Sequence, residues 1–325
     1  MPRPHSPRNR LPAIGLGLCL VLAGCGVDQS PSTPPTTPAA ATPSVTVSGS
    51  SAVLPSASGT PGAPSATAAV LGYQEFAVPA GSHPHDVAPA PDGTVWYTAQ
   101  ATGELGRLDP ATGQTHHIPL GEGSSPHGVI VGPDGAAWVT DSGLNAILRV
   151  HPRTERVQAF PLPAGTPNVN LNTATFDRLG WLWFTGQAGW YGRLQLPAGV
   201  VDPFQAPRGG GPYGIATDPA GAPWFSSLAG SYIARIDAEP AEVPDILDTP
   251  TPGGGARRIW FDSRGRAWVT EWNAGKLAMF DPVAGRWQEW QLPGPGPQPY
   301  AVFVDERDMV WVSERPRQTS VTFAA

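Results

Sequence analysis

Residues 126–140 read Pro-His-Gly-Val-Ile-Val-Gly-Pro-Asp-Gly-Ala-Ala-Trp-Val-Thr, and variants of this phrase return along most of the chain. The tryptophan recurs about every 43 residues, at Trp96, Trp138, Trp183, Trp224, Trp268 and Trp311. A fixed period of this length is typical of repeat architectures in which each unit forms one supersecondary element. The repeat therefore decides the fold class before any single element is assigned.

Each unit contains four strand-like segments. The phrase predicts two strands joined by Pro-Asp-Gly, because proline fixes φ and glycine accepts a positive φ. A third strand follows, as at 147–150, and a fourth ends in proline, as at 159–163, which favours an exposed outer edge. No segment carries a sustained helical period. We therefore predict an all-β protein, a β-propeller of four-stranded blades with six repeats. The alternative, a β-sandwich, would not give a 43-residue phrase.

The two ends of the repeat region are irregular. Glu75–Val78 resembles a lone fourth strand ahead of the first unit, and we expect it to close the ring by pairing with the last blade. The sixth unit has no recognisable third strand after Glu314. Either Ser320–Phe323 supplies a makeshift strand to a six-bladed ring, or a terminal blade is lost. We expect the junction between the two ends of the repeat region to be the least stable part of the ring.

Composition divides the chain into a leader and a body. Every Trp, Tyr and Phe lies at Tyr73 or later, although the chain has 39 Gly and 40 Pro. Residues 73–325 can bury a core, whereas the aromatic-free leader cannot. The net charge is −6 and only 14% of residues are charged. A nucleic-acid partner is therefore not expected, and we expect a monomer.

The first 24 residues have the pattern of a lipoprotein signal peptide. A basic start and an apolar run lead to Leu22-Ala23-Gly24-Cys25, which resembles the bacterial lipobox. We expect lipid on Cys25 to anchor an extracytoplasmic, cell-envelope protein to a bacterial membrane; the alternative is an ordinary signal peptide with a chance cysteine. Cys19 would leave with the signal, so the mature domain would have no disulfide. Residues 25–72, rich in Pro, Ser, Thr and Ala, are expected to form a disordered stalk.

The repeated phrase, with the Ile147–Val150 strand and the Phe-x-Leu-Pro edge, resembles the streptogramin (virginiamycin B) lyase family over residues 73–314. The resemblance implies a seven-bladed propeller that uses a divalent metal, usually Mg²⁺. It also implies opening of the ester linkage of type B streptogramin depsipeptides by elimination instead of hydrolysis.

The family's catalytic set lies in its last two blades, and this chain departs from it. Arg257 stands at the first family His, Gln298 at a family Glu and Tyr300 at the second His, so that only Glu314 matches. Tyrosine is a poor base at neutral pH, and glutamine is an uncharged ligand for a hard cation. The family's active site is therefore not reproduced at its usual positions.

First strands of a propeller converge on its axis, so the residue after Pro in each unit should rim one mouth of the channel. These residues are His85, His127, Asn172, Tyr213, Arg257 and Tyr300. We expect the last four to bind a small molecule or cyclic peptide at this axial mouth. A second ring, the candidate Mg²⁺ ligands, contains Asp141, Glu271 and Glu314. The alternative is that these polar groups bond one another and water.

Histidines of the body lie only in the first two units. Elimination needs a base poised near neutral pH, which makes His85 and His127 the candidate catalytic residues. With Asp141 they could form a metal or acid-base cluster; the alternative is a structural role for Pro-His in this family. His116 and His117 belong to an outer edge strand, and we expect them to be solvent-exposed.

Two function classes remain open. The first is a metal-assisted lyase acting outside the cytoplasm, with a calcium-dependent lactonase-type propeller as a variant that would use Asn172, Asp141 and Glu271. The second is a non-catalytic, surface-tethered propeller that binds a ligand or a protein. The loss of three of the four family catalytic positions favours the second class.

Replacing Cys25 with Ser tests the anchor. The substitution removes the thiol that lipid would modify, so the protein should move from the detergent phase to the aqueous phase in a detergent partition experiment. Cys19→Ser, within the signal, is the matched control and should partition as the unmodified chain does. Unchanged membrane association of the Cys25 variant would contradict the lipobox interpretation.

Overall fold

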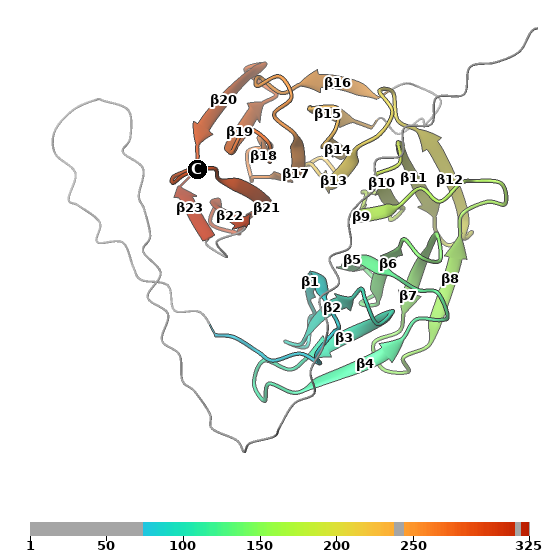
Figure 1. The fold of residues 1–325 in the computed structure, drawn as a ribbon. Helices are drawn as coiled ribbons and strands as arrows, with labels where there is room; N and C mark the ends of the chain where they lie inside the picture. The colour runs from blue at the N-terminus through green and yellow to red at the C-terminus, as the bar shows by residue number, and fades with distance from the viewer. Residues whose placement is uncertain (1–73, 237–243, 316–319, 325) are drawn as a thin grey trace, which may run out of the picture. The chain divides into compact units, whose positions relative to one another are not determined.

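The computed structural model describes residues 74–236, 244–315 and 320–324. These residues form strands in six antiparallel sheets that stand around a common axis as blades (Figure 1). The predicted all-β propeller is therefore confirmed. The described residues form no helix that could cross a membrane. Cys25, the signal and the stalk lie outside the described residues.

Within each blade the strands run in sequence order from the axis outward (Figure 1). The first blade contains β1 (Pro84–Pro89), β2 (Val95–Ala99), β3 (Glu104–Leu108) and β4 (Thr115–Pro119). The second contains β5 (Pro126–Val131), β6 (Ala137–Asp141), β7 (Ala146–Val150) and β8 (Val157–Pro161). The third contains β9 (Leu171–Phe176), β10 (Leu182–Gly186), β11 (Trp190–Gln195) and β12 (Val200–Gln205).

The remaining blades follow the same order. The fourth contains β13 (Pro212–Thr217), β14 (Pro223–Ser227), β15 (Tyr232–Arg235) and β16 (Asp245–Asp248). The fifth contains β17 (Ala256–Phe261), β18 (Ala267–Glu271), β19 (Lys276–Asp281) and β20 (Arg286–Gln291). The sixth contains β21 (Gln298–Val304), β22 (Met309–Arg315) and β23 (Ser320–Ala324). Residues 320–324 thus supply the makeshift strand, and the last sheet has three described strands.

The prediction for Glu75–Val78 was wrong. These residues form no strand, and Phe76 lies close to Gly113 in the turn between β3 and β4 of the first blade. An extended segment becomes a strand only when a partner edge pairs with it, and here the segment's aromatic residue packs on a neighbouring hairpin turn instead. It therefore does not close the ring.

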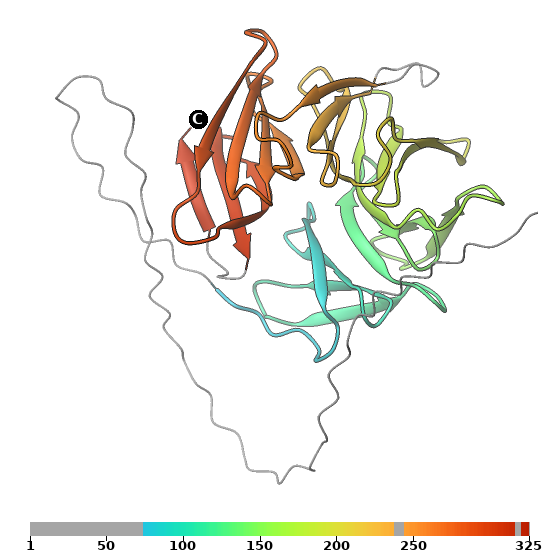
Figure 2. The same ribbon diagram turned by 45° about the horizontal axis from the view of Figure 1, so that its top comes forward.

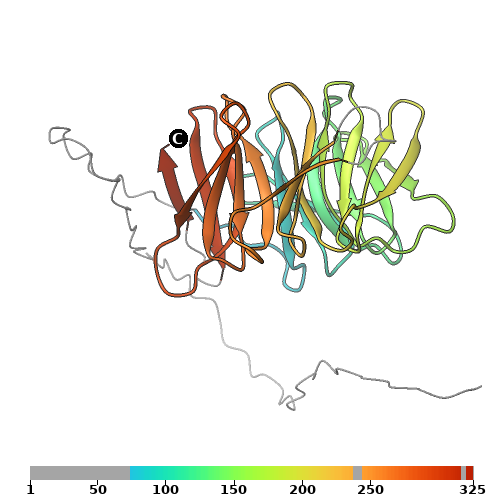
Figure 3. The same ribbon diagram turned by 90° about the horizontal axis from the view of Figure 1, so that it is seen from above.

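The hydrophobic core lies between adjacent blades. One cluster joins Trp96 and Leu105 of the first blade to Val129, Val139 and Leu148 of the second. Because alternate residues of a strand point to opposite faces, each sheet presents one apolar face to the preceding blade and one to the following blade. The core is thus a series of apolar layers between the blades that lie edge-on in Figure 3.

In five of the six blades, the repeated tryptophan donates a hydrogen bond to the first turn. Indole Nε1 donates to the turn aspartate at 2.8–3.1 Å in the second to sixth blades, in the pairs Trp138–Asp134, Trp183–Asp177, Trp224–Asp218, Trp268–Asp262 and Trp311–Asp305. The first blade differs, because Trp96 Nε1 is buried without a hydrogen-bond partner. The aspartate of the first turn therefore fixes the tryptophan in these five blades.

A second repeated bond connects neighbouring blades near the axis. The hydroxyl of Thr98 donates to the carbonyl of His127 at 2.9 Å, and the hydroxyl of Ser226 donates to the carbonyl of Arg257 at 2.8 Å. Thr140 and Thr185 make the equivalent bonds to Asn172 and Tyr213. Each acceptor is a residue of the predicted axial mouth. The hydroxyl that follows the repeated tryptophan therefore fixes the start of the next inner strand.

The sixth and first blades flank a side of the ring that no other described blade covers (Figure 2). Val87 on β1 is 65% exposed and Phe303 on β21 is 47% exposed, whereas Val129, the counterpart of Val87, is 5% exposed. Val129 is less exposed than Val87 because the first blade packs against Val129. We refer to this side as the seam.

Thr140→Val tests the bond between blades. The substitution keeps the shape of the side chain but leaves the carbonyl of Asn172 and the N–H of Gly128 without their hydroxyl partner, and Thr140 is fully buried. We expect the free energy of unfolding to fall by about 3 kcal/mol in urea denaturation. Ser313→Ala is the matched control, because this equivalent hydroxyl at the seam is exposed, and it should cost under about 1 kcal/mol. Equal losses would contradict this role.

Candidate functional site

Six inner strands place the predicted mouth residues around the axis. Each residue follows the first residue of its strand or stands near it, and a register irregularity follows in the pairing with the second strand. This bulge leaves the side chain directed away from the regular ladder. We call the set of His85, His127, Asn172, Tyr213, Arg257 and Tyr300 the mouth ring.

Side chains of the mouth ring contact one another. The ring centroids of His85 and His127 lie 3.7 Å apart, and His127 Nε2 lies 3.2 Å from Asn172 Nδ2. On the other side, Tyr300 Oη lies 2.9 Å from His85 Nε2. Arg257 donates to the hydroxyl of Tyr213. The ring of Tyr213 in turn contacts His127 edge to face, which completes the circle of contacts. The structure thus brings all six predicted mouth residues together.

Burial within the mouth ring is uneven. His127, Asn172, Tyr213 and Arg257 are buried, whereas His85 and Tyr300 are half-buried. The two half-buried residues belong to β1 and β21, the inner strands on either side of the seam. The accessible part of the mouth is therefore the His85–Tyr300 pair.

The two histidines have different chemical environments. Burial, followed by the neighbouring His85, lowers the pKa of His127 from 6.5 to about 3, so His127 is neutral at physiological pH. The Nδ1 atoms of both histidines are buried without a hydrogen-bond partner. His85 Nδ1 lies 3.6 Å from Asp86 Oδ1. His85 is therefore the histidine that combines partial access with a nearby carboxylate.

A charged layer, which the sequence analysis missed, lies directly behind the mouth ring. Arg258 reaches across the axis and donates to Asp86 at 2.9 Å and to Thr173 at 2.9 Å. Burial alone would raise the pKa of Asp86, but the charge of Arg258 and the neighbouring His85 outweigh it and lower the value to about 2. The signal was present in the sequence: Asp86 and Arg258 are charged at a position that is Gly128 or Gly214 elsewhere.

The glycines at this position are required by the approach of the next blade. A Cβ at Gly128 would collide with the carbonyl of Asn172, and a Cβ at Gly214 would lie 2.7 Å from the Cα of Arg258. Since two blades contribute no side chain here, the long guanidinium of Arg258 has room to cross. The Arg258–Asp86 ion pair therefore lies behind the mouth ring.

Arg257 occupies an aromatic box. Its guanidinium carbon lies 3.5 Å from the ring centroid of Tyr300, 4.4 Å from that of Tyr213 and 4.6 Å from that of Trp272. Such contacts stabilise a cation that has left water. Burial, together with the nearby Tyr213, raises the pKa of Tyr300 to about 12, so that its hydroxyl keeps its proton at neutral pH. Arg257 thus places a fixed positive charge beside a phenol.

The three predicted metal-binding carboxylates end equivalent strands and have different surroundings. Asp141 accepts from the backbone N–H groups of Ser125 at 3.0 Å and Leu144 at 2.9 Å, which anchors a turn. Burial, followed by the neighbouring Glu289, raises the pKa of Glu271 to about 7. Glu314 is buried at the end of β22 opposite Pro299.

A different group is close enough to hold a metal. Within the described part of the chain, donor atoms of His85, Asp86 and His127 lie within 4.8 Å of one another. Two imidazoles and one carboxylate do not fit Mg²⁺, which prefers an octahedron of oxygen ligands. The family cofactor is therefore not supported by this donor set.

The outer histidines are not equivalent. His116 is exposed, as predicted, and lies 3.0 Å from Glu155. The prediction for His117 was wrong: this residue is half-buried, with Nδ1 2.9 Å from Glu104 and Nε2 2.7 Å from Tyr97 Oη. It is covered because Tyr97 lies over Gly106 on the same face of the sheet, which brings its hydroxyl to the imidazole.

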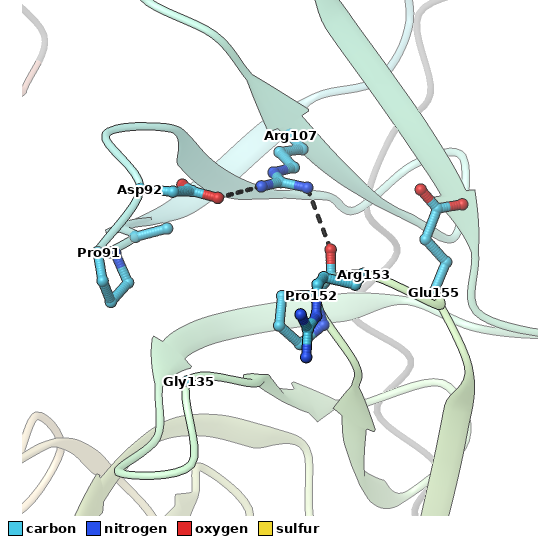
Figure 4. Close-up of a pocket in the computed structure, with 8 residues that line it drawn as sticks. Pro91, Asp92, Arg107, Gly135, Pro152, Arg153 and Glu155 are labelled. Carbon is cyan, nitrogen blue, oxygen red and sulfur yellow. Dashed lines mark hydrogen bonds and ion pairs between the residues drawn. The ribbon is translucent and has the colours of Figure 1, made fainter.

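A cavity of about 430 Å³ lies away from the mouth, between turns of the first and second blades (Figure 4). Arg107 donates to Asp92 and to the carbonyl of Pro152 across it (Figure 4). None of the predicted site residues lines this cavity. Because Arg107 and Asp92 are already paired with each other, the mouth ring is the better candidate site.

The buried, neutral His127 predicts a pH dependence of stability. Its pKa is lower in the folded state, so the unfolded chain binds the proton first as the pH falls below 6.5. Stability should therefore decrease from pH 6.5 toward pH 3 by up to about 1.4 kcal/mol per pH unit. Urea denaturation at a series of pH values measures this slope. His127→Gln should reduce it and His116→Gln should not; equal slopes in both variants would contradict the assignment.

Comparison with solved structures places the fold beside known lyases. A catalytically inactive variant of virginiamycin B lyase from Staphylococcus aureus, solved with quinupristin, is 25% identical, with a TM-score of 0.66 over 73% of this chain and 78% of that chain. A streptogramin B lyase structure is 22% identical, with a TM-score of 0.69 over 78% and 86%. A gluconolactonase from Xanthomonas campestris, 16% identical with a TM-score of 0.52 over 71% and 82%, shares the fold alone.

No curated protein sequence matches the chain. The model of the virginiamycin B lyase family, by contrast, matches residues 55–320, which is most of the sequence and includes every strand around the mouth ring. The resemblance noted in the repeated phrase is thereby confirmed at the level of the family. The chain belongs to the virginiamycin B lyase family.

Proposed function

We propose that the protein opens the ester linkage of a cyclic depsipeptide, such as a type B streptogramin, by elimination at the mouth ring. Family membership and the likeness to two streptogramin lyase structures support the reaction class. The observation that carries the proposal is the half-buried contact of Tyr300 and His85, with Arg257 directly over the Tyr300 ring. A proton acceptor and a buried cation then stand side by side where the mouth is accessible.

In this proposal His85 is the base. It accepts a proton from the carbon atom adjacent to the carbon that bears the ester oxygen. The electron pair of that C–H bond forms a carbon–carbon double bond, and the C–O bond breaks, so that the ester oxygen leaves as a carboxylate. No water is consumed, and the proton remains on His85 until it is lost to solvent. Asp86, 3.6 Å from His85 Nδ1, stabilises the imidazolium that forms.

Arg257 and Tyr300 have binding roles in this scheme. The fixed charge of Arg257 attracts the ester carbonyl and the carboxylate that develops from it. Tyr300, which keeps its proton, donates a hydrogen bond and does not act as the base. Asn172 and Tyr213 are buried and hold the rings in place. No step depends on Mg²⁺, because the donor set at the mouth does not fit that ion.

A type B streptogramin incubated with the full chain, with and without Mg²⁺, tests the proposal. Elimination gives a linear product with the mass of the substrate, whereas hydrolysis adds one water, so mass spectrometry separates the two reactions. His85→Ala should lower kcat by about 10² to 10⁴-fold, the usual contribution of a general base. His116→Ala, an exposed histidine of the same blade, is the control and should leave the rate unchanged.

Two results would contradict this assignment. Activity that survives in His85→Ala would exclude His85 as the base, and a product heavier by one water would exclude elimination. His127→Ala should retain more activity than His85→Ala, because its lowered pKa makes it a weak base. A larger loss in His127→Ala, in a variant that melts at the temperature of the parent, would reverse the two roles.

A second candidate function is non-catalytic binding of a ligand or protein by a surface-tethered propeller. The observation that favours it is that Arg257 and Tyr300 replace family catalytic residues and bond within the mouth ring. Calorimetry with the same streptogramin separates the alternatives, since binding without turnover would support the second. In either case we propose an extracytoplasmic location, with lipid on Cys25 as the membrane anchor.

A further inference from the structure

Two imidazoles and a carboxylate meet at the boundary between the mouth ring and the charged layer behind it. Donor atoms of His85, Asp86 and His127 lie within 4.8 Å of one another, and they come from β1 and β5 of adjacent blades. His127 is 6% exposed, and its Nδ1 is buried without a hydrogen-bond partner. His85 Nδ1 is likewise buried without a partner. Nitrogen atoms in this condition need a ligand or a proton acceptor.

We propose that His85, Asp86 and His127 form a binding site for a divalent transition metal of the zinc class. Zn²⁺ is commonly held by imidazole nitrogen and carboxylate oxygen, with three protein ligands and a water in sites that stay open. Mg²⁺ and Ca²⁺ prefer oxygen ligands only. The donor set therefore selects a borderline metal instead of the hard cation that the family resemblance implies.

The distances are compatible with tetrahedral coordination. With metal–ligand bonds of about 2.1 Å, two ligands of a tetrahedral zinc ion lie about 3.4 Å apart. His85 Nδ1 and Asp86 Oδ1 are already 3.6 Å apart. The imidazole of His127 is tilted against that of His85, with the ring centroids 3.7 Å apart. Because the donor atoms lie within 4.8 Å of one another, they need to approach by at most about 1.4 Å to reach this spacing. Strands β1 and β5 thus hold the three side chains close to the spacing that a tetrahedral metal needs.

Neighbouring groups support the ligands. A histidine that binds a metal through one nitrogen usually donates its other N–H to a fixed acceptor. Tyr300 Oη lies 2.9 Å from His85 Nε2, and the amide of Asn172 lies 3.2 Å from His127 Nε2, where its oxygen can accept once the amide is turned over. Arg258 donates to Asp86 Oδ1 at 2.9 Å, the same oxygen that lies 3.6 Å from His85 Nδ1. Its charge opposes a cation, but its bond fixes the carboxylate, whose oxygens keep further lone pairs for a metal.

This inference is independent of the proposed function. A metal on His85 Nδ1 would keep the proton on Nε2, so that His85 could not act as a base while the metal is bound. The metal-bound state would then be an inhibited state of the lyase. Metal binding is measured without substrate, and the two proposals can therefore fail separately.

The test uses the full chain without a polyhistidine tag. Titration with Co²⁺ should produce the intense visible absorption of a tetrahedral site, and Zn²⁺ should displace it with the release of a single equivalent of Co²⁺. Calorimetry then gives the Zn²⁺ affinity at neutral pH. We expect His85→Ala and His127→Ala each to weaken binding by about 100-fold or more, and Tyr300→Phe, which removes only a supporting bond, by about 10-fold. His116→Ala is the control and should bind as the parent does.

The buried His127 could be needed for folding, so circular dichroism accompanies each variant, and the half-buried His85 provides a second variant. X-ray absorption at the zinc edge of the unmodified protein should show two imidazole ligands. The proposal is overturned if the parent binds no Zn²⁺, if both folded variants bind it unchanged, or if the zinc edge shows no imidazole. Zinc binding without lyase activity would contradict only the proposed function, and lyase activity without zinc binding would contradict only this inference.

Discussion

The structure depends on a buried hydroxyl that bridges each of the first four blades to the blade that follows it. In the second blade the hydroxyl of Thr140 accepts from the N–H of Gly128 in its own inner strand and donates to the carbonyl of Asn172 in the next. Thr98 makes the same two bonds, to Asp86 N–H and His127 C=O. A hydroxyl suits this place because it can donate and accept at once. The bond stabilises the bulge that opens each inner strand and fixes the backbone of the next mouth residue.

This arrangement separates the framework of the ring from its chemistry. The framework holds mouth residues by their backbone carbonyl, so their side chains can vary without disturbing the junction. The position that accepts this bond is filled by four different side chains, those of His127, Asn172, Tyr213 and Arg257. A family pattern built on Trp, Gly and Asp therefore predicts the fold well and the reaction poorly. It also explains how Arg257 can stand where relatives are expected to have a histidine, within an unchanged propeller.

The sequence predicted those features that repeat and missed those that occur once. Tryptophan spacing, Pro-Asp-Gly turns and the proline-edged outer strand identified the blades, because each blade obeys the same local rules. The strand at 320–324 was foreseen only as an alternative, since nothing in Ser320–Phe323 resembles the other third strands. Glu75–Val78 failed because β propensity cannot indicate whether a partner edge is free. Arg258 and Asp86 were missed because a contact across 172 residues has no local pattern.

The charges at the axis are distributed unevenly across the mouth ring. Arg258 and Asp86 neutralise each other, and His127 is neutral because it is buried beside His85. What remains is the cation Arg257 on one side of the mouth ring and the half-buried His85 on the other, with Tyr300 in contact with both. Val87 and Phe303 are exposed on β1 and β21, the same inner strands that carry His85 and Tyr300, so apolar side chains flank the seam beside this pair. In the proposed function, the ester of the cyclic depsipeptide would bind at this polarised pair, where its carbonyl faces Arg257.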